Sequence, residues 1–169
     1  MSSMDIAIPK KIIDEAVKKG IDIEEVIMDL LVKALNLDPR FAAEARIELA
    51  LKYLDEGGSL VNEDPIQASE KLYKAAEESV KALTIYFNLT DILSNVKRRG
   101  RWTVTELEKA VLKISEKLGI WFMDAWDHAW ALHIWGFHET KFDAEDIKPR
   151  LPSIEKIVKE AKNTIEKGE

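Results

Sequence analysis

Hydrophobic residues recur every three to four positions through most of the chain, which is the spacing of one face of an α-helix. The pattern is clearest over residues 23–35, 39–54, 65–86, 104–118 and 154–165. Only residues 4–8 alternate apolar and polar side chains in the way that a strand does. The pattern therefore predicts an all-α fold, an up-and-down bundle of helices with an N-terminal helical appendage.

Residues that start and stop helices stand between these stretches. Asp38-Pro39 and Asp64-Pro65 each place an aspartate at an N-cap and a proline at the first helical position. Another helix starts with a capping box, formed either by Thr103 with Glu106 or by Thr105 with Glu108. We expect Gly57-Gly58 to end the helix from Pro39, because glycine is a poor helix former.

The charged residues of segment 65–86 have helical spacing. Glu70–Lys74, Lys74–Glu78 and Glu77–Lys81 are four residues apart, so each pair lies on one side of a helix. Such exposed pairs stabilise a helix by only about 0.2–0.5 kcal/mol each. The spacing therefore predicts a face that points to solvent.

The chain divides into residues 1–37, an N-terminal helical pair, and residues 38–169, the main bundle. In the first part Pro9 opens a short helix and Gly20 closes it, and Asp22 with Glu25 starts a second helix. The pair packs either on the bundle or on a second chain. A strand followed by two helices is also the order of a ribbon-helix-helix DNA-binding module, but this strand presents Asp5 and Ala7, which do not suit DNA.

Composition narrows the classes of function. A net charge of −6 and an isoelectric point near 5.3 argue against a DNA-coating protein. The absence of cysteine excludes disulfides, zinc–thiolate sites and thiol nucleophiles, and fits a cytoplasmic location. No signal peptide or membrane-spanning segment is expected. Charged residues make up 33%, with one glutamine, a composition typical either of thermophilic proteins or of ordinary helical proteins. We expect no cofactor and no bound metal.

The segment 121–138 holds four of the five tryptophans and all three histidines. A helical wheel gathers Trp126, Trp130, His133 and Phe137 on one side and leaves the segment apolar almost all round. This pattern is typical of a helix buried at the centre of a bundle or in an interface. The wheel also gives a narrow polar stripe of weak catalytic candidates: Asp124, Asp127, His128 and His138. The stripe is either an acid–base or metal site, or a set of side chains that satisfy one another and the backbone.

A second candidate site is the cationic segment 97–102. Its residues are Lys97, Arg98, Arg99, Arg101 and Trp102, with Gly100 between the arginines. Guanidinium groups suit phosphates and an indole ring can stack on a base, so the segment is a candidate for binding a nucleotide or RNA. The alternative is a solvated loop whose charges neutralise acidic helix ends.

Three blocks of the sequence resemble the archaeal PaREP family. They are Ala68–Glu78, Arg99-Gly100-Arg101-Trp102 and His133–Glu139, and the N-terminal stretch ending at Leu35–Pro39 is similar too. That family is grouped with HEPN-like helical bundles, which are similar to the helical domain of kanamycin nucleotidyltransferase. The resemblance implies RNA cleavage, nucleotide binding, or partnership with a nucleotidyltransferase, often in toxin–antitoxin pairs.

The nuclease members of this superfamily carry an arginine followed, after four to six residues, by a histidine. None of the six arginines here is followed by histidine at that spacing. The leading hypothesis is therefore a non-catalytic HEPN-like module that forms a homodimer through either its aromatic segment or its N-terminal helical pair. It would bind nucleotide or RNA phosphate through residues 97–102. The alternative is an RNase, or an accessory of a nucleotidyltransferase-type partner, that uses the Asp/His stripe of segment 121–138.

Overall fold

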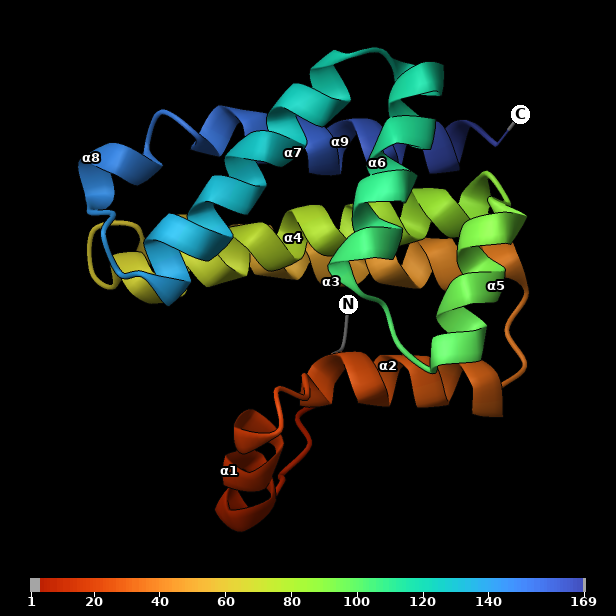
Figure 1. The fold of residues 1–169 in the computed structure, drawn as a ribbon, viewed down its shortest axis with the longest axis horizontal. Helices are drawn as coiled ribbons and strands as arrows, with labels where there is room; N and C mark the ends of the chain where they lie inside the picture. Colours follow the sequence, from red (N-terminus) through yellow and green to blue (C-terminus); the bar gives the residue numbers. More distant parts are fainter. Residues whose placement is uncertain (1–3, 169) are drawn as a thin grey trace. The chain divides into compact units, whose positions relative to one another are not determined.

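The computed structural model describes residues 4–168, and within that range every regular element is a helix (Figure 1). The all-α prediction is confirmed. The chain divides after Asp38 into two compact units, described separately here. None of the described helices is long and apolar enough to cross a membrane. The helices are α1 Lys10–Lys18, α2 Ile23–Ala34, α3 Pro39–Leu60, α4 Pro65–Tyr86, α5 Thr90–Arg99, α6 Val104–Leu118, α7 Trp121–Ala131, the π-helix η1 Leu132–His138, α8 Ala144–Ile147 and α9 Leu151–Lys167.

The N-terminal unit consists of α1 and α2. The side chain of Asp22 caps α2 by accepting a hydrogen bond from the backbone N–H of Glu25 at 3.3 Å. Neither helix contains a buried residue. Residues 4–8, the alternating segment, form no strand. The unit therefore consists of well-formed helices that enclose no core of their own.

The second unit is a bundle built around α4. This helix contacts α3, α6, α7, η1 and α9, and α3 runs beside it over its length (Figure 1). Small side chains at Ala68, Ala75, Ala76 and Ala82 are fully buried, so neighbouring helices approach α4 closely from several sides. The central helix is therefore α4, and the aromatic segment lies beside it.

Helix α3 does not end at Gly57-Gly58 but continues to Leu60, so the predicted stop is wrong. The reason is packing against α4. A Cβ atom on Gly57 would lie 2.8 Å from Cγ of Leu72, whereas one on Gly58 would meet nothing within 4 Å. Gly57 thus allows a close helix–helix approach within an intact helix.

The segment between α4 and α6 forms a further helix, α5. It ends at Gly100, whose φ of 74° is the left-handed conformation common just after a helix. Helix α6 then begins at Val104 with a capping box formed by Thr103 and Glu106. The first of the two predicted starts is confirmed.

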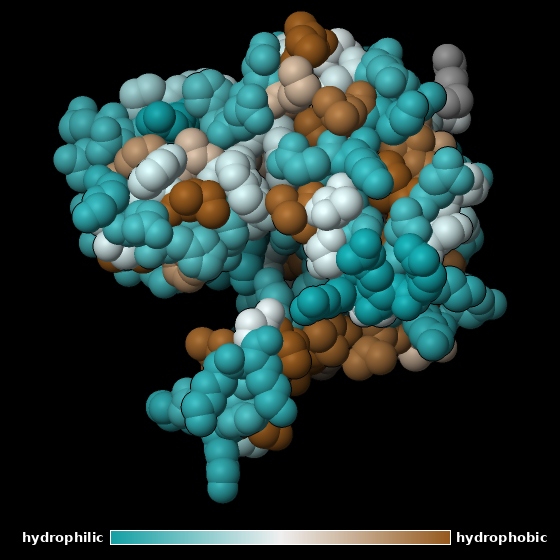
Figure 2. Space-filling model, viewed as in Figure 1, coloured by the Kyte–Doolittle hydropathy of each residue, from teal (hydrophilic) through white to brown (hydrophobic). Residues whose placement is uncertain are grey.

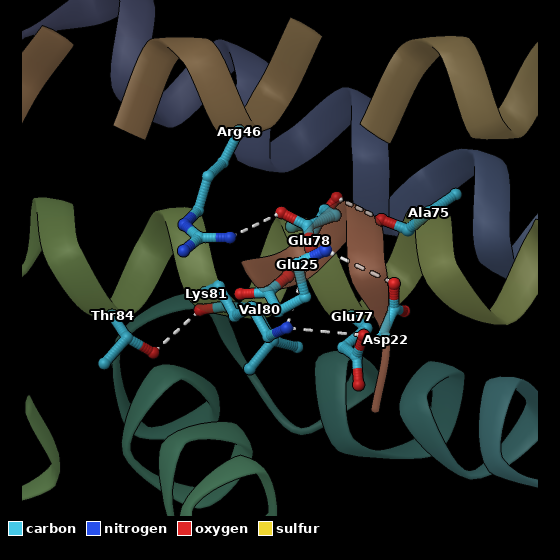
Figure 3. Close-up of polar contacts among 10 residues, drawn as sticks. Asp22, Glu25, Arg46, Ala75, Glu77, Glu78, Val80, Lys81 and Thr84 are labelled. Carbon is cyan, nitrogen blue, oxygen red and sulfur yellow. Dashed lines mark hydrogen bonds and ion pairs between the residues drawn. The ribbon is translucent and has the colours of Figure 1, made fainter. Parts of the chain in front are cut away.

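The charged face of α4 does not point to solvent at its centre. Glu78 and Lys81 are each only 2% exposed. Nη1 of Arg46, from α3, lies 2.8 Å from Oε2 of Glu78, and Nζ of Lys81 lies 3.4 Å from Oε2 of Glu77 (Figure 3). The solvated-face prediction is wrong for these residues, because Arg46 supplies an opposite charge to Glu78 from another helix while Lys81 pairs with Glu77 and Glu78. Buried charges persist when they are paired.

Candidate functional site

The aromatic segment has one buried face rather than being buried all round. On α7 the buried residues are Phe122, Ala125, Trp126 and Ala129. The indole N–H of Trp126 donates a hydrogen bond to Oε1 of Glu108 at 2.8 Å, which satisfies its one polar atom. Trp126 therefore lies inside the bundle, and of the residues expected at an interface only Trp130, His133 and Phe137 are partly exposed.

The polar stripe does not assemble as a site. Asp124, Asp127 and His128 are exposed on α7. Within the described part of the chain, no hydrogen bond joins Asp124 to His128. His138 is exposed too, but it lies on η1 and contacts His133. The Asp/His pairing expected from the sequence is not formed.

The π-helix η1 brings two histidines together instead. Nε2 of His133 lies 3.1 Å from Nε2 of His138, and the two rings meet edge to face. In an α-helix, residues five apart point about 140° away from each other. A π-helix hydrogen-bonds residues five apart, so it places both imidazoles on one side. We call His133 and His138 the histidine pair.

Glu70 of α4 orients the histidine pair. Its Oε2 lies 3.0 Å from Nδ1 of His133, and the two side chains are 17% and 18% exposed. Because a carboxylate only accepts hydrogen bonds, Nδ1 of His133 carries the proton and donates it. In the neutral ring, Nε2 of His133 is then the acceptor, and Nε2–H of His138 is the donor.

Aromatic rings hold His133 in place. Tyr73 stacks on its ring with centroids 4.0 Å apart, and Trp130 lies at 5.3 Å. The Tyr73 hydroxyl donates a hydrogen bond to Oε1 of Glu77 at 3.0 Å. Burial, reinforced by the negative charge of Glu77, raises the pKa of Tyr73 far above its usual range. The phenol therefore stays neutral beside the imidazole.

Gly136 lets η1 approach α4 closely enough for these contacts. A Cβ atom at this position would lie 2.2 Å from Oγ of Ser69. Ser69 is itself fixed, because its hydroxyl donates to the carbonyl oxygen of Pro65 at 2.8 Å. A glycine at position 136 is thus a condition for the contact between Glu70 and His133.

Sequence reasoning missed Glu70 and Tyr73 as members of this site. Glu70 is 63 residues from His133 in sequence, and it looked like one of several charges on a solvated face. The five-residue spacing of the two histidines was visible, but a wheel at α-helical pitch separates them. Within residues 4–168, no group of three or more His, Asp and Glu side chains is placed to hold a metal ion.

The cationic segment is partly engaged by the protein itself. Nε of Arg99 lies 3.1 Å from Oε1 of Glu106, which is 2% exposed, and Arg98 donates to Oδ1 of Asn95 at 3.1 Å. Lys97 and Arg101 are exposed. Trp102 is partly buried, with Nζ of Lys81 at 5.9 Å from its ring centroid. All four cations of the segment are thus exposed, but Arg98 and Arg99 bind partners within the protein.

The Thr103 hydroxyl donates a hydrogen bond to Glu106. This bond, together with the hydrogen bonds from the backbone N–H groups and the charge of Arg99, lowers the pKa of Glu106 despite its burial. Arg99 consequently faces a carboxylate that is ionised at neutral pH. Its guanidinium is less available to an external phosphate than the sequence indicates.

The bundle is similar to known archaeal proteins in both sequence and structure. The model of the archaeal PaREP1/PaREP8 family matches residues 45–158. A crystal structure of a protein from Sulfolobus solfataricus is 38% identical, with a TM-score of 0.65, and the match covers 70% of this chain and 97% of that one. A solution structure of the same structural-genomics target is 38% identical with a TM-score of 0.61, covering 71% and 93%. No curated protein matches.

Proposed function

Because the chain belongs to the archaeal PaREP1/PaREP8 family, whose matched region begins at residue 45, we propose that the bundle is the family module and the N-terminal unit joins two copies of it. The protein is then a homodimeric, non-catalytic helical module of the HEPN-like type. One observation carries the proposal: the N-terminal unit exposes its large hydrophobic side chains.

The exposed residues cover both helices and the segment before them. Among them Val17 is 72% exposed and Leu35 is 64% exposed. Figure 2 shows hydrophobic residues gathered along α2. Full burial of one such side chain is worth about 1.5–3 kcal/mol, so covering several of them favours association strongly. The others are Met4, Ile6, Ile12, Ile13, Ile21, Val26, Leu30 and Leu31.

The N-terminal unit is also too small to form a core alone. It ends at Asp38, and domains below about 40 residues usually need disulfides, a metal or a partner chain. Disulfides are impossible here because the chain has no cysteine. The bundle of the same chain and a partner chain are then the two ways to bury the apolar faces without a bound group, and we propose the partner chain.

The charge pattern supports a second copy of the chain as that partner. Residues 10–19 carry four lysines and two acidic residues, whereas residues 22–34 carry four acidic residues and one lysine. In a two-fold interface each contact occurs twice with the roles exchanged. Helix α1 of one copy against α2 of the other therefore pairs opposite charges on both sides of the axis.

Sedimentation equilibrium of the full chain tests the proposal. We expect a dimer at micromolar concentration, and a monomer for Leu30→Glu, which introduces a charge at a position 59% exposed in the single chain. Leu112→Glu is the matched control, because Leu112 is 53% exposed on α6 of the other unit and should leave the dimer intact. A monomeric wild-type chain, or a dimeric Leu30→Glu variant with unchanged circular dichroism, would refute self-association through this unit.

A phosphate site at the end of α5 is the second candidate function. Lys97 and Arg101 are exposed on either side of Gly100, so their charges are available to a nucleotide or RNA. Fluorescence anisotropy with a short single-stranded RNA should show binding that weakens with salt, by a slope of about 0.7 per phosphate contact. Arg101→Ala should reduce the slope and Lys113→Ala, on α6, should not. An RNA affinity that changes neither with salt concentration nor in the Arg101→Ala variant would exclude the site.

The RNase alternative has less support from the geometry. Among the described residues, no hydrogen bond or ion pair joins Asp124 to His128, and His138 pairs with His133 rather than with either of them. A nucleotidyltransferase-type partner is the competing occupant of the exposed apolar face. Co-expression would then yield a heteromer in place of the homodimer.

A further inference from the structure

We propose that the histidine pair is a binding site for a divalent transition-metal ion, held by the two Nε2 atoms of His133 and His138. The proposal is independent of self-association, because all the residues involved lie in the bundle. It rests on the separation of the two nitrogens, the hydrogen bond between Nδ1 of His133 and Glu70, and the contacts that hold His133 and η1 in place.

The separation of the nitrogens suits one shared ion. Nε2 of His133 and Nε2 of His138 are 3.1 Å apart. Two imidazole nitrogens that each lie about 2.1 Å from one tetrahedral ion are about 3.4 Å apart. An ion therefore fits with a shift of a few tenths of an ångström, once the proton of His138 has moved from Nε2 to Nδ1 and so leaves both Nε2 atoms unprotonated. The edge-to-face arrangement of the rings keeps them from blocking each other.

Glu70 prepares His133 for a metal. An imidazole binds a metal through an unprotonated nitrogen, and the carboxylate fixes the proton of His133 on Nδ1, 3.0 Å away. Nε2 of His133 is consequently unprotonated, and its lone pair points toward His138. A carboxylate that holds the far nitrogen of a ligating histidine is the usual outer partner at metal sites, and it strengthens the ligand as a base.

The arrangement is preorganised on one side and accessible on the other. His133 is held by the stacked ring of Tyr73, and η1 is held against α4 by the close contact of Gly136 with Ser69. His138 is exposed, so an ion can enter from solvent. Since the protein offers two ligands, water or a small anion completes the coordination.

The chemistry of the ligands defines the class of ion. Imidazole suits copper, nickel and zinc, whereas magnesium and calcium prefer oxygen ligands. Affinity for a nitrogen site generally follows the order nickel below copper, with copper above zinc. We therefore expect binding of Ni²⁺, Cu²⁺ and Zn²⁺, and no competition from Mg²⁺.

Isothermal titration calorimetry of the full chain without an affinity tag tests the site, with NiCl₂ and ZnCl₂ as probes. We expect one ion per chain. His138→Ala should weaken binding more than tenfold, and because this side chain is exposed the fold should be unaffected. His128→Ala is the matched control, since His128 is an exposed histidine of α7 without an imidazole neighbour, and it should bind as the wild type does. Glu70→Gln should weaken binding by about 10–100-fold.

Three results of the titration would overturn the metal-site proposal. The proposal is overturned if the wild type shows no saturable binding of either ion, which would leave the contact as a hydrogen bond alone. It is also overturned if His138→Ala binds as tightly as the wild type, or if His128→Ala is the variant that loses the ion. The absorption spectrum of the Co²⁺-loaded chain should report nitrogen ligands in the wild type and change in His138→Ala.

Discussion

The buried carboxylate of Glu106 is stabilised by one residue close to it in sequence and by one from another helix. Thr103, three residues earlier, donates through its hydroxyl and its backbone N–H, while Arg99 brings a positive charge from α5. Together they lower the pKa of Glu106. The same carboxylate closes the cap of α6 and joins α5 to α6.

We expect Glu106→Gln to destabilise the protein at neutral pH and much less in acid. The pKa of Glu106 is lower in the folded than in the unfolded state, so the unfolded chain binds more protons near pH 4. The stabilisation from Glu106 is therefore fully present above its unfolded pKa of about 4.3 and is lost as the pH falls through the folded pKa. Urea unfolding at several values between pH 3 and pH 7 measures this. A stability difference that stays constant over that range would contradict it.

Local capping is the kind of residue-scale contact that could be predicted. Thr103 and Glu106 are three residues apart, so their pairing depends only on helix geometry. The burial of Glu78 could not be predicted, because the opposing charge of Arg46 is 32 residues away from it. Glu70 was missed for the same reason. A charge on a helix looks solvated until its distant partner is known.

At the scale of the element, the packing of η1 against α4 depends on the absence of a side chain at position 136. Gly57 has the same role between α3 and α4, where a Cβ would meet Leu72. Both glycines lie inside helices, where glycine costs about 0.5–1 kcal/mol relative to alanine. Their cost is offset by the close approach that they permit.

We expect Gly136→Ala to destabilise the bundle by about 1–3 kcal/mol, which is the usual cost of overpacking. The added Cβ would overlap Oγ of Ser69, so η1 must move away from α4 and separate His133 from Glu70. Gly58→Ala is the control, since nothing lies within 4 Å of its Cβ and alanine is the better helix former. Chemical denaturation compares the two. Equal stability of Gly136→Ala and the wild type would show that η1 packs differently.

The helices could be predicted from hydrophobic spacing, but the π-helix could not. A wheel at 3.6 residues per turn assumes the pitch that it is used to detect, so it assigned His138 to the stripe of Asp127. The helix at 90–99 also gave no clear signal, because Gly100 and four cations dominate that stretch. Spacing identifies elements of standard pitch and misses the departures that assemble this site.

At the scale of the whole molecule, the chain combines a family bundle with an added unit. The solved relative is matched over 97% of its length but covers only 70% of this chain, and the family match begins at residue 45. The solved relative is therefore a chain of nearly bundle size. The N-terminal unit contributes exposed apolar surface instead of core.

We expect a chain that begins at Pro39 to fold on its own and to be monomeric where the full chain is dimeric. Its helical signal by circular dichroism and its cooperative thermal unfolding should resemble those of the full chain per residue. Light scattering of the two chains at equal concentration gives the oligomeric state. An unfolded or aggregated shorter chain would mean that the bundle needs residues 1–38.

The fold class and the helical order could be predicted at this scale, but the centre of the bundle could not. The density of tryptophan and histidine over 121–138 favoured that segment as the central helix. The structure centres on α4, whose buried alanines carry little hydrophobic signal but permit close neighbours on several sides. A helix takes the central place when small side chains at many positions let other helices approach it, more than when it carries a few large rings.

The number of residues in the π-helix determines the direction in which the chain continues after His138. An α-helix with one residue fewer would place the two imidazoles four apart, and they would again be neighbours. Trp135, which is 52% exposed, is the residue whose removal disturbs the core least. Such a deletion would keep the histidines adjacent yet turn the chain beyond them by about 100°. The added residue therefore acts as a register correction, and insertions or deletions here are constrained even where substitutions are not.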